Sequence, residues 1–264
     1  MTRLTLPAYR HLLYALIARE IQLRYRGSGL GLFWAVITPV LLMLVYYFVF
    51  SLVFQVKLPQ LYDGRDVPFA GFIFSGLIVY FLFAEILTRG PALIHENINY
   101  VKKVVFPIEI IPVVVVAASA FNFLISCVVL TLFLVVFGGG ITPTILLAPL
   151  VILPFVLFLC GVAWFTSAIS VYVKDVAYVA GFIATAMMFL SPVFYSLEAV
   201  PENFQRIMML NPLTYYIEGF RSCVIGGVVP DTKFFVVAYA AGTVTCALGY
   251  AFFQKVRRGF ADVL

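Results

Sequence analysis

The sequence predicts an all-α integral membrane protein with six transmembrane helices, an amino-terminal amphipathic helix at the membrane interface, and short re-entrant helices before the last span. Three observations predict this fold class. Of the 264 residues, 64% are hydrophobic and only 11% are charged, whereas soluble domains carry about 25% charged residues. Five long runs contain no charged residue. Within these runs the apolar residues follow one another without the alternation of a barrel strand, which favours helices.

The charge-free runs are long enough to cross a bilayer, whose core of roughly 30 Å needs about 20 apolar residues in a helix. The longest run, residues 110–173, contains the sequence Gly138-Gly139-Gly140-Ile141-Thr142-Pro143. Because Gly and Pro in that density make a turn, this run predicts two spans. The six expected spans are 29–54, 69–87, 110–137, 145–171, 177–195 and 234–253.

Two further segments predict helices that do not cross the membrane. Residues 6–25 place apolar side chains such as Leu13 and Ile17 at helical spacing, which predicts an amphipathic helix in the interface. Residues 196–233 combine apolar side chains with Pro201 and Pro212, which predicts short re-entrant helices. We expect one transmembrane domain over 1–264, divided into the interface helix (1–26), spans one to five (27–195), the re-entrant loop (196–233) and the last span with its tail (234–264).

Basic residues predict the orientation of the chain. With both termini placed inside, twelve of the 17 Lys and Arg residues lie on the inner side, as is typical of cytoplasmic loops. We therefore expect a multi-pass membrane protein with both termini in the cytoplasm. The net charge of +5 then favours contact with anionic membrane lipids, not with nucleic acid. The first apolar run is too long for a cleavable signal peptide.

Motifs for catalysis, metal binding and nucleotide binding are missing from the sequence. It contains no Gly-x-x-x-x-Gly-Lys-Ser/Thr, so a P-loop is excluded. Its two histidines and four cysteines have no metal-ligand spacing. Glu85, near the inner end of the second span, is expected to pair with Arg89 one turn away and not to relay protons. An enzyme or a proton-coupled carrier is therefore not the expectation.

Five short stretches carry a family resemblance when they are read in order. They are Arg19-Glu20 with Leu23-Arg24-Tyr25, Ser28-Gly29-Leu30-Gly31, Phe33-Trp34-Ala35 and Pro39; Lys102-Lys103-Val104-Val105-Phe106-Pro107; Val173-Lys174-Asp175-Val176; Ser191-Pro192-Val193-Phe194-Tyr195 with Asn211-Pro212; and Phe260-Ala261-Asp262-Val263-Leu264. Together they resemble the type-2 ABC exporter permeases of lipid-linked polysaccharides, which include O-antigen, capsular polysaccharide and teichoic acid transporters. The third stretch departs from the Phe-Arg-Asp that this family often has.

The resemblance implies that two copies of this chain work with two copies of a separate ABC ATPase. ATP and Mg would be bound by that partner, so no cofactor or metal is expected in this chain. The implied function is export of an O-antigen-like polysaccharide, a step of lipopolysaccharide biosynthesis. A coupling helix within 97–107 and the loop 172–175 would contact the ATPase. The candidate contacts are Asn97, Lys102, Lys103, Phe106, Pro107, Lys174 and Asp175.

The resemblance also implies a path for the substrate through the membrane, and several residue types are candidates for it. Arginine recognises phosphate bidentately, so the basic residues of 19–26 are candidates for the lipid pyrophosphate, with ordinary headgroups as the competing partner. Aromatic rings can pack on the flat faces of sugars, although aromatic belts are also common in membrane proteins. The substrate-path candidates are Arg19, Arg24, Arg26, Trp34, Tyr46, Tyr47, Phe50, Phe189, Phe194, Tyr195, Asn211 and Arg221.

Three alternatives are weighed against this function. The first is a related ABC-2-type exporter of a small lipophile or drug, against which the segments 102–107 and 211–212 count. The second is a membrane-embedded enzyme of lipid-linked glycans, against which the scatter of charges in 196–233 counts. The third is a scaffold protein, against which the two separate docking segments count. Gly71 with Gly76, or Gly242 with Gly249, are packing hints for the dimer interface.

Overall fold

The computed structural model describes residues 6–56, 67–102, 106–138 and 140–264, and in these ranges all regular structure is helical. The long helices are α1 (Leu6–Tyr25), α2 (Trp34–Tyr46), α3 (Phe69–Arg89), α6 (Ile110–Phe137), α7 (Ala148–Ser170), α8 (Val176–Leu190) and α11 (Thr232–Val256). The short ones are η1 (Gly31–Phe33), η2 (Tyr47–Val53), η3 (Gly90–Ala92), α4 (Leu93–Glu96), α5 (Ile98–Lys102), η4 (Pro143–Leu147), η5 (Leu197–Ala199), α9 (Glu202–Met208), α10 (Pro212–Arg221), η6 (Ser222–Gly226), η7 (Arg257–Gly259) and α12 (Phe260–Val263). The predicted all-α membrane class is confirmed.

Five helical stretches in the described residues are long and apolar enough to cross a membrane. They are Gly31–Val53, Phe69–Glu96, Ile110–Phe137, Pro143–Ser170 and Thr232–Gly259. Each overlaps a predicted span, and the predicted third span has the observed bounds of α6. The fifth predicted span, 177–195, corresponds to the 15-residue α8, which is shorter than the others.

Helix α8 ends early because the chain turns extended at its carboxyl end. Ser191 has φ −110° and ψ 153°, the region that a residue before proline prefers, and Pro192 follows it. At about 1.5 Å per residue, a helix of 15 residues is shorter than the bilayer core. The prediction that one helix continues to residue 195 is therefore wrong.

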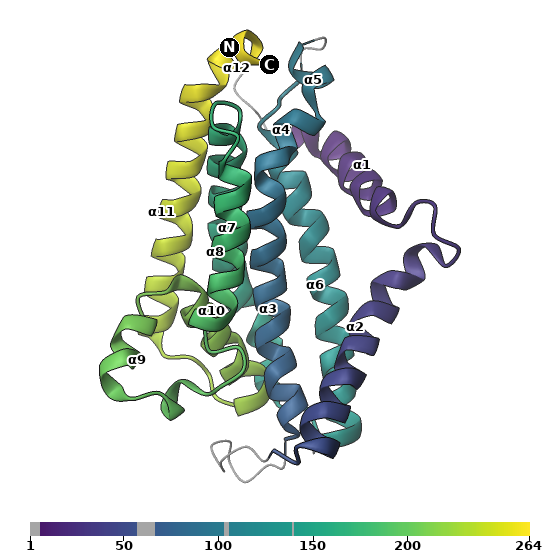
Figure 1. Cartoon of the computed structure of the whole chain (residues 1–264), viewed down its shortest axis with the longest axis vertical. Coiled ribbons are helices and arrows are strands. Elements are labelled where there is room, and N and C mark those ends of the chain that lie inside the picture. Colours follow the sequence, from purple (N-terminus) through teal and green to yellow (C-terminus); the bar gives the residue numbers. More distant parts are fainter. Residues whose placement is uncertain (1–5, 57–66, 103–105, 139) are drawn as a thin grey trace.

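Helix α3 is the centre of the bundle. It packs against α6, α8, α10 and α7, and Phe72, Ile73 and Leu77 on it are fully buried. Most of its apolar window lies inside the protein, whereas only 11% of the window of Gly31–Val53 does. Figure 1 shows α3 between its neighbours and α2 leaning away at the edge. Helix α2 therefore presents most of its apolar surface outward.

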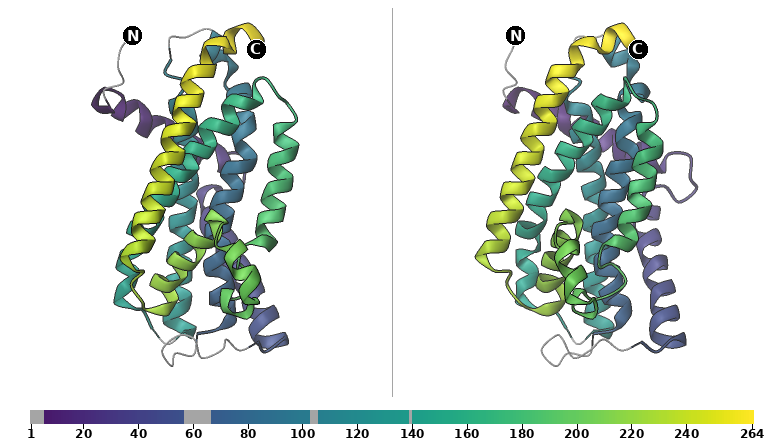
Figure 2. Two further views of the ribbon diagram at one scale, coloured as in Figure 1. Left: turned by 90° about the vertical axis from the view of Figure 1, so that its left-hand side faces the viewer. Right: turned by 60° about the vertical axis from the view of Figure 1, so that its left-hand side comes forward.

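The bundle has two distinct ends. Helices α1, α4, α5 and α12 gather at the end that also holds the carboxyl terminus, here called the α1 end (Figure 1). Residues 197–226, here called the α9–α10 hairpin, lie at the opposite end, and α8 stands beside the main bundle (Figure 2). The short helices predicted in 196–233 are present, and α1 spans the predicted interface segment.

Helices α7 and α11 cross in close contact at glycines. A Cβ on Gly249 would lie 2.2 Å from the carbonyl oxygen of Gly161, and a Cβ on Gly242 would lie 2.3 Å from that of Pro154. Small residues let membrane helices approach this closely. Gly71 likewise faces Phe133 of the same chain. The glycines considered as hints of a dimer interface thus form contacts within one chain.

The α7–α11 crossing predicts a large effect of a single methyl group. Gly249→Ala should lower the free energy of unfolding by about 1–3 kcal/mol, the usual range for overpacking, because the new Cβ meets backbone and not a movable side chain. Gly181→Ala on α8 is the matched control, since a Cβ there meets nothing within 4 Å. Thermal unfolding of the purified variants in detergent measures both, and equal midpoints for the two variants would contradict the prediction.

Candidate functional site

Helix α1 is held to α3 and α6 by charged and polar side chains. An Nη atom of Arg24 pairs with the carboxylate of Glu85 on α3, and the other donates to Ser119 Oγ on α6 over 3.0 Å. One turn before Arg24, Glu20 accepts from Arg89 Nη1 of α3 at 2.7 Å. Arg24 Nε lies 3.9 Å from the same Glu20 carboxylate. These four charged groups are named the α1–α3 joint.

The α1–α3 joint differs from the pairing expected within α3. Glu85 was predicted to pair with Arg89 one turn away, but each of the two reaches across to α1 instead. In the structure, the Glu85 carboxylate and the Arg89 guanidinium both lie on the face of α3 that meets α1. Both groups lose hydration at this contact between helices. An oppositely charged partner on the neighbouring helix therefore stabilises them more than a partner on a solvated face would.

Tyr25 extends the joint along α6. Its hydroxyl donates to Asn122 Oδ1 at 2.9 Å. Burial raises the pKa of this phenol above its ordinary value, and the charge of Arg24 opposes the shift. The hydroxyl therefore stays protonated and remains a donor at physiological pH.

The other two arginines of the basic segment lie elsewhere. Arg19 is exposed and its Nη1 donates to the hydroxyl of Tyr100 on α5 at 2.8 Å. Arg26 is exposed just beyond the end of α1. Of the three phosphate candidates, Arg24 thus sits inside the α1–α3 joint with 14% of its side chain exposed, while Arg19 and Arg26 have accessible guanidinium groups.

At the α1 end, the residues that precede the two segments predicted to dock an ATPase are joined to each other. His95 Nε2 lies 3.2 Å from the carbonyl oxygen of Ser170. Ser170 Oγ in turn donates to the carbonyl of Pro91 at 2.7 Å. Arg89 also approaches Glu96 at 3.9 Å. The α4–α5 segment therefore contacts the end of α7 and, through Arg89 and Tyr100, helix α1.

A small apolar cluster seals this junction. Ile94 of α4 packs with Ala168, Val171, Phe253 and Phe260. The rings of Phe253 and Phe260 meet edge to face with centroids 5.6 Å apart. The carboxyl-terminal stretch of the family resemblance therefore forms part of the same structure as the α4–α5 segment.

The candidate ATPase contacts occupy different settings. Lys174 and Asp175 are exposed in the turn between α7 and α8. Asn97 Nδ2 donates to the carbonyl of Leu93 within the segment, and Lys102 Nζ donates to the backbone oxygen of Leu264. The Phe106 ring stacks on Tyr100 at 4.6 Å. Pro107, the next residue, is half-buried, and Lys103 lies outside the described residues.

The aromatic candidates form two groups near the opposite end of the bundle. Tyr46 and Phe50 stack at 6.2 Å on the first span, and Tyr47 packs against Phe133 and Phe137 of α6. A second group joins the ends of α8 and its following turn, where Phe189 and Phe194 lie 6.3 Å apart and the Tyr195 hydroxyl donates to the carbonyl of Phe189. Trp34 is 38% exposed at the start of α2.

Asn211 and Arg221 hold the α9–α10 hairpin in place. Asn211 caps α10 by accepting from the Leu213 N–H, and its Nδ2 donates to Ser191 Oγ at 2.9 Å. The Arg221 side chain is fully buried, with its Cζ 3.7 Å above the centre of the Phe72 ring.

Arg221 binds groups from three parts of the chain. It donates to Glu218 Oε1 at 2.7 Å and to the carbonyl of Val193 at 3.3 Å. Its Nε is 3.4 Å from Ser75 Oγ. The buried guanidinium thus positions the hairpin on α3. That Arg221 lines a substrate path stays a prediction.

Several residues of this site were not singled out from the sequence. Glu20 belongs to the motif that carried the family resemblance, but its partner Arg89 lies on another helix. Ser119 and Asn122 were detectable as two polar residues three positions apart, on one face of an otherwise apolar span. Tyr100 and Ser170 carried no signal, because their contacts link segments far apart in the chain.

Taken together, the apolar spanning helices and the polar α1 end define a polytopic helical membrane protein. Residues 11–225 match the ABC-2 type transporter family. Since the match covers most of the chain, the protein belongs to that family of ABC transporter membrane subunits, which implies an ABC ATPase as its partner.

Relatives with curated descriptions match over nearly the whole chain. The chain is 28% identical to the O-antigen export system permease protein RfbA of Klebsiella pneumoniae over 256 residues, which is 96% of this chain and 95% of that protein. It is 28% identical to the RfbA protein of Myxococcus xanthus with the same coverage. The chain is 24% identical to the polysialic acid transport protein KpsM of Escherichia coli over 82% of each chain. The resemblance stated from the motifs is confirmed.

The α1–α3 joint predicts that Arg24 stabilises the fold and that Arg26 does not. Arg24→Gln and Glu85→Gln should each lower the free energy of unfolding by about 1–3 kcal/mol, the range for hydrogen bonds to charged groups. The double variant should lose less than the two losses added together. Thermal unfolding in detergent provides the measurement.

Arg26→Gln is the control for these variants, because Arg26 is exposed beyond α1. Its effect should stay within about 0.5 kcal/mol, as is usual at surface positions. If Arg24→Gln unfolded at the same temperature as Arg26→Gln, the joint would have no stabilising role.

Proposed function

We propose that this chain is the transmembrane subunit of an ABC exporter that moves a lipid-linked, O-antigen-like polysaccharide across the bacterial inner membrane. The observation that carries the proposal is the match over 96% of the chain to permeases named for O-antigen export. A match of this length includes α1, the α4–α5 segment and the α9–α10 hairpin, so the likeness extends beyond the spanning helices.

The proposal includes an orientation with the α1 end in the cytoplasm. Basic residues at this end, including Lys102, Lys174 and Arg258, support it by the positive-inside rule. In this orientation α8 and the turn after it form the fifth of six crossings, and the α9–α10 hairpin dips into the outer leaflet. Burial of α10 against α3 and α7 agrees with a re-entrant element covered by protein.

The functional unit that we propose is a homodimer with two ATPase subunits, which bind ATP and Mg. The outward apolar surfaces of α2 and α8 support contact with a second copy: Leu44 and Phe48 on the first span, and Tyr178 and Phe182 on α8, are more than half exposed. Large apolar patches of this kind face either lipid or a protein partner. The aromatic groups near Phe50 and Phe194 would then lie along the polysaccharide path.

The contacts at the α1 end provide a route from ATPase to membrane helix. An ATPase that moves the α4–α5 segment would pull on α1 through the Arg19–Tyr100 hydrogen bond and on the α1–α3 joint through Arg89. Because α1 lies where a lipid-linked substrate would approach from the inner leaflet, its displacement would control access. Arg19 and Arg26 are the guanidinium groups that remain available for a pyrophosphate.

Deletion of the gene tests the proposed substrate. Cells that lack this chain should lose the polysaccharide from their surface and accumulate its lipid-linked form in the inner membrane, because synthesis continues when export stops. Immunoblotting of surface glycan and of extracted lipid-linked glycan measures both pools. Restoration by the intact chain is the control. Normal surface polysaccharide in the deletion strain would refute the substrate assignment.

The Lys174 turn tests the docking of the ATPase. Lys174→Glu should weaken co-purification of the ATPase and reduce export, because it reverses an exposed charge in a proposed contact. Lys233→Glu is the matched control: it makes the same change at an exposed position at the opposite end of the bundle. The ratio of ATPase to permease after purification is the readout, and an equal ratio for the two variants would exclude this contact.

A further inference from the structure

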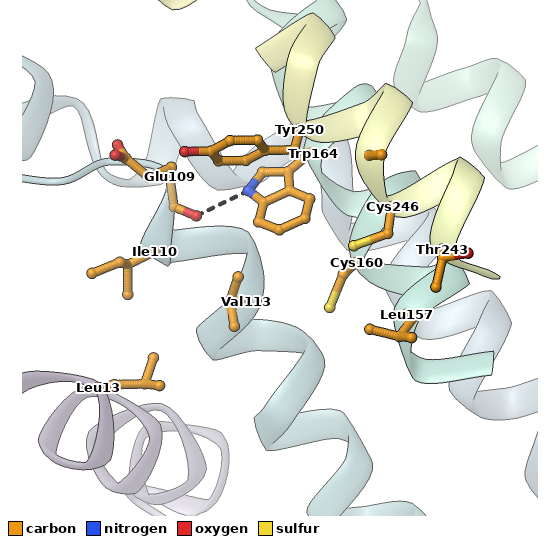
Figure 3. A pocket seen from close by; sticks show the side chains of 11 residues that line it. Leu13, Glu109, Ile110, Val113, Leu157, Cys160, Trp164, Thr243, Cys246 and Tyr250 are labelled. Carbon is orange, nitrogen blue, oxygen red and sulfur yellow. Dashed lines mark hydrogen bonds between the residues drawn. The ribbon is translucent and has the colours of Figure 1, made fainter. Parts of the chain in front are cut away.

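A cavity of about 590 Å³ lies between α1, α6, α7 and α11. Figure 3 shows its lining side chains projecting from four separate helices into one space. They include Leu13 of α1, Ile110 and Val113 of α6, Leu157 and Trp164 of α7, and Tyr250 of α11. Pockets that bind small ligands have volumes of about 300–1,000 Å³, so this cavity can hold one.

The interior of the cavity is mostly apolar, and two of the polar side chains on its wall are paired within the protein. Thr243 donates its hydroxyl to the carbonyl of Tyr239 at 2.6 Å. Trp164 Nε1 donates to the carbonyl of Glu109 at 2.9 Å. A ligand inside therefore finds hydrocarbon and ring surfaces. This wall is suited to an alkyl chain, since a ligand with several hydrogen-bonding groups would leave them unsatisfied.

One side of the cavity is bounded by a carboxylate that is paired with a partly exposed arginine. Figure 3 shows Glu109 on the side away from Leu157 and Thr243. Glu109 is bonded to Arg257 Nη1 at 2.7 Å, and 36% of the Arg257 side chain remains exposed. The exposed Arg258 adjoins Arg257 in the chain.

Helix α1 carries a further cation about one turn from a lining residue of the cavity. Exposed Arg10 precedes Leu13, a lining residue, by three positions, so the two lie on the same side of α1. Glu109 is the acidic member of the lining residues, and its charge is taken up by Arg257. The surplus of guanidinium groups is therefore complementary to an anion.

We propose that this cavity binds one acyl chain of a phospholipid whose anionic headgroup rests against Arg257, Arg258 and Arg10. The long helices on three sides of the cavity, α6, α7 and α11, belong to apolar spans, so an acyl chain reaches it from the bilayer. The bound lipid fills the space between Leu13 and α11. It thereby fixes the first half of α1, whose second half is held by the α1–α3 joint.

Tryptophan fluorescence tests the site, because the chain has only two tryptophans. In the full chain carrying Trp34→Phe, Trp164 is the single reporter inside the cavity. Phosphatidylglycerol with brominated acyl chains, added at low mole fractions to the protein in detergent, should quench Trp164 saturably. Half-saturation should need about fivefold less of it than of brominated phosphatidylcholine, a ratio given by roughly one basic residue acting on an anionic lipid.

The complementary variant Trp164→Phe is the control, because it leaves Trp34 on the outward-facing α2. Its quenching should rise in proportion to the lipid added and be equal for the two headgroups. The double variant Arg10→Gln, Arg258→Gln should reduce the headgroup preference of Trp164 while leaving the unfolding temperature unchanged, because both side chains are exposed. Val113→Phe, which fills the cavity, should weaken quenching by both lipids.

Three results would overturn the proposal. If quenching of Trp164 rose in proportion to the lipid added and were equal for the two headgroups, bulk lipid would contact the helices without a specific binding site. Displacement of the brominated lipid by a polyprenyl phosphate in preference to phosphatidylglycerol would assign the cavity to the transported lipid. If the Arg10→Gln, Arg258→Gln double variant kept the full headgroup preference, these two arginines would not contact the headgroup.

Discussion

The α1–α3 joint is the interaction on which the arrangement of the α1 end depends. Helix α1 lies obliquely to the bundle (Figure 1) and packs against α6. Charged groups link it to α3: Glu20 and Arg24 on one turn meet Glu85 and Arg89 on one turn of α3. Since Arg89 also approaches Glu96, a displacement of α4 or of α1 changes the electrostatic energy of the other.

Helix α3 also positions the elements at the opposite end of the bundle. Its buried residues contact α6, α7 and α8 along its length, and near its start Phe72 and Ser75 receive the guanidinium of Arg221. A Cβ on Gly76 would lie 2.7 Å from that guanidinium and 3.2 Å from the Val193 backbone. The α9–α10 hairpin and the turn after α8 are thus seated on one helix, which also carries the α1–α3 joint.

Properties that are local in sequence were predictable, and those that depend on spatial neighbours were not. Charge-free runs predicted α6 with its observed bounds, because the bilayer imposes a length on any apolar helix. The break at Ser191 was visible only as Pro192, which does not by itself end a membrane helix. Glu85 has Arg89 one turn away in sequence, yet its partner Arg24 comes from a helix sixty residues earlier. The burial of Arg221 was not predictable for the same reason, since it depends on α3 and on the turn at Val193.

Three arginines in this protein show how burial separates structural cations from cations that can bind a ligand. Arg221 is fully buried, and its surrounding acceptors hold the guanidinium without room for an anion. Arg24 is nearly as enclosed and is committed to Glu85 and Ser119. Arg257 has one carboxylate partner and keeps a third of its side chain exposed. A phosphate can approach Arg257 without breaking its bond to Glu109, because a guanidinium has five N–H donors. The same chemical group therefore serves the fold at two positions and is available to a lipid at the third.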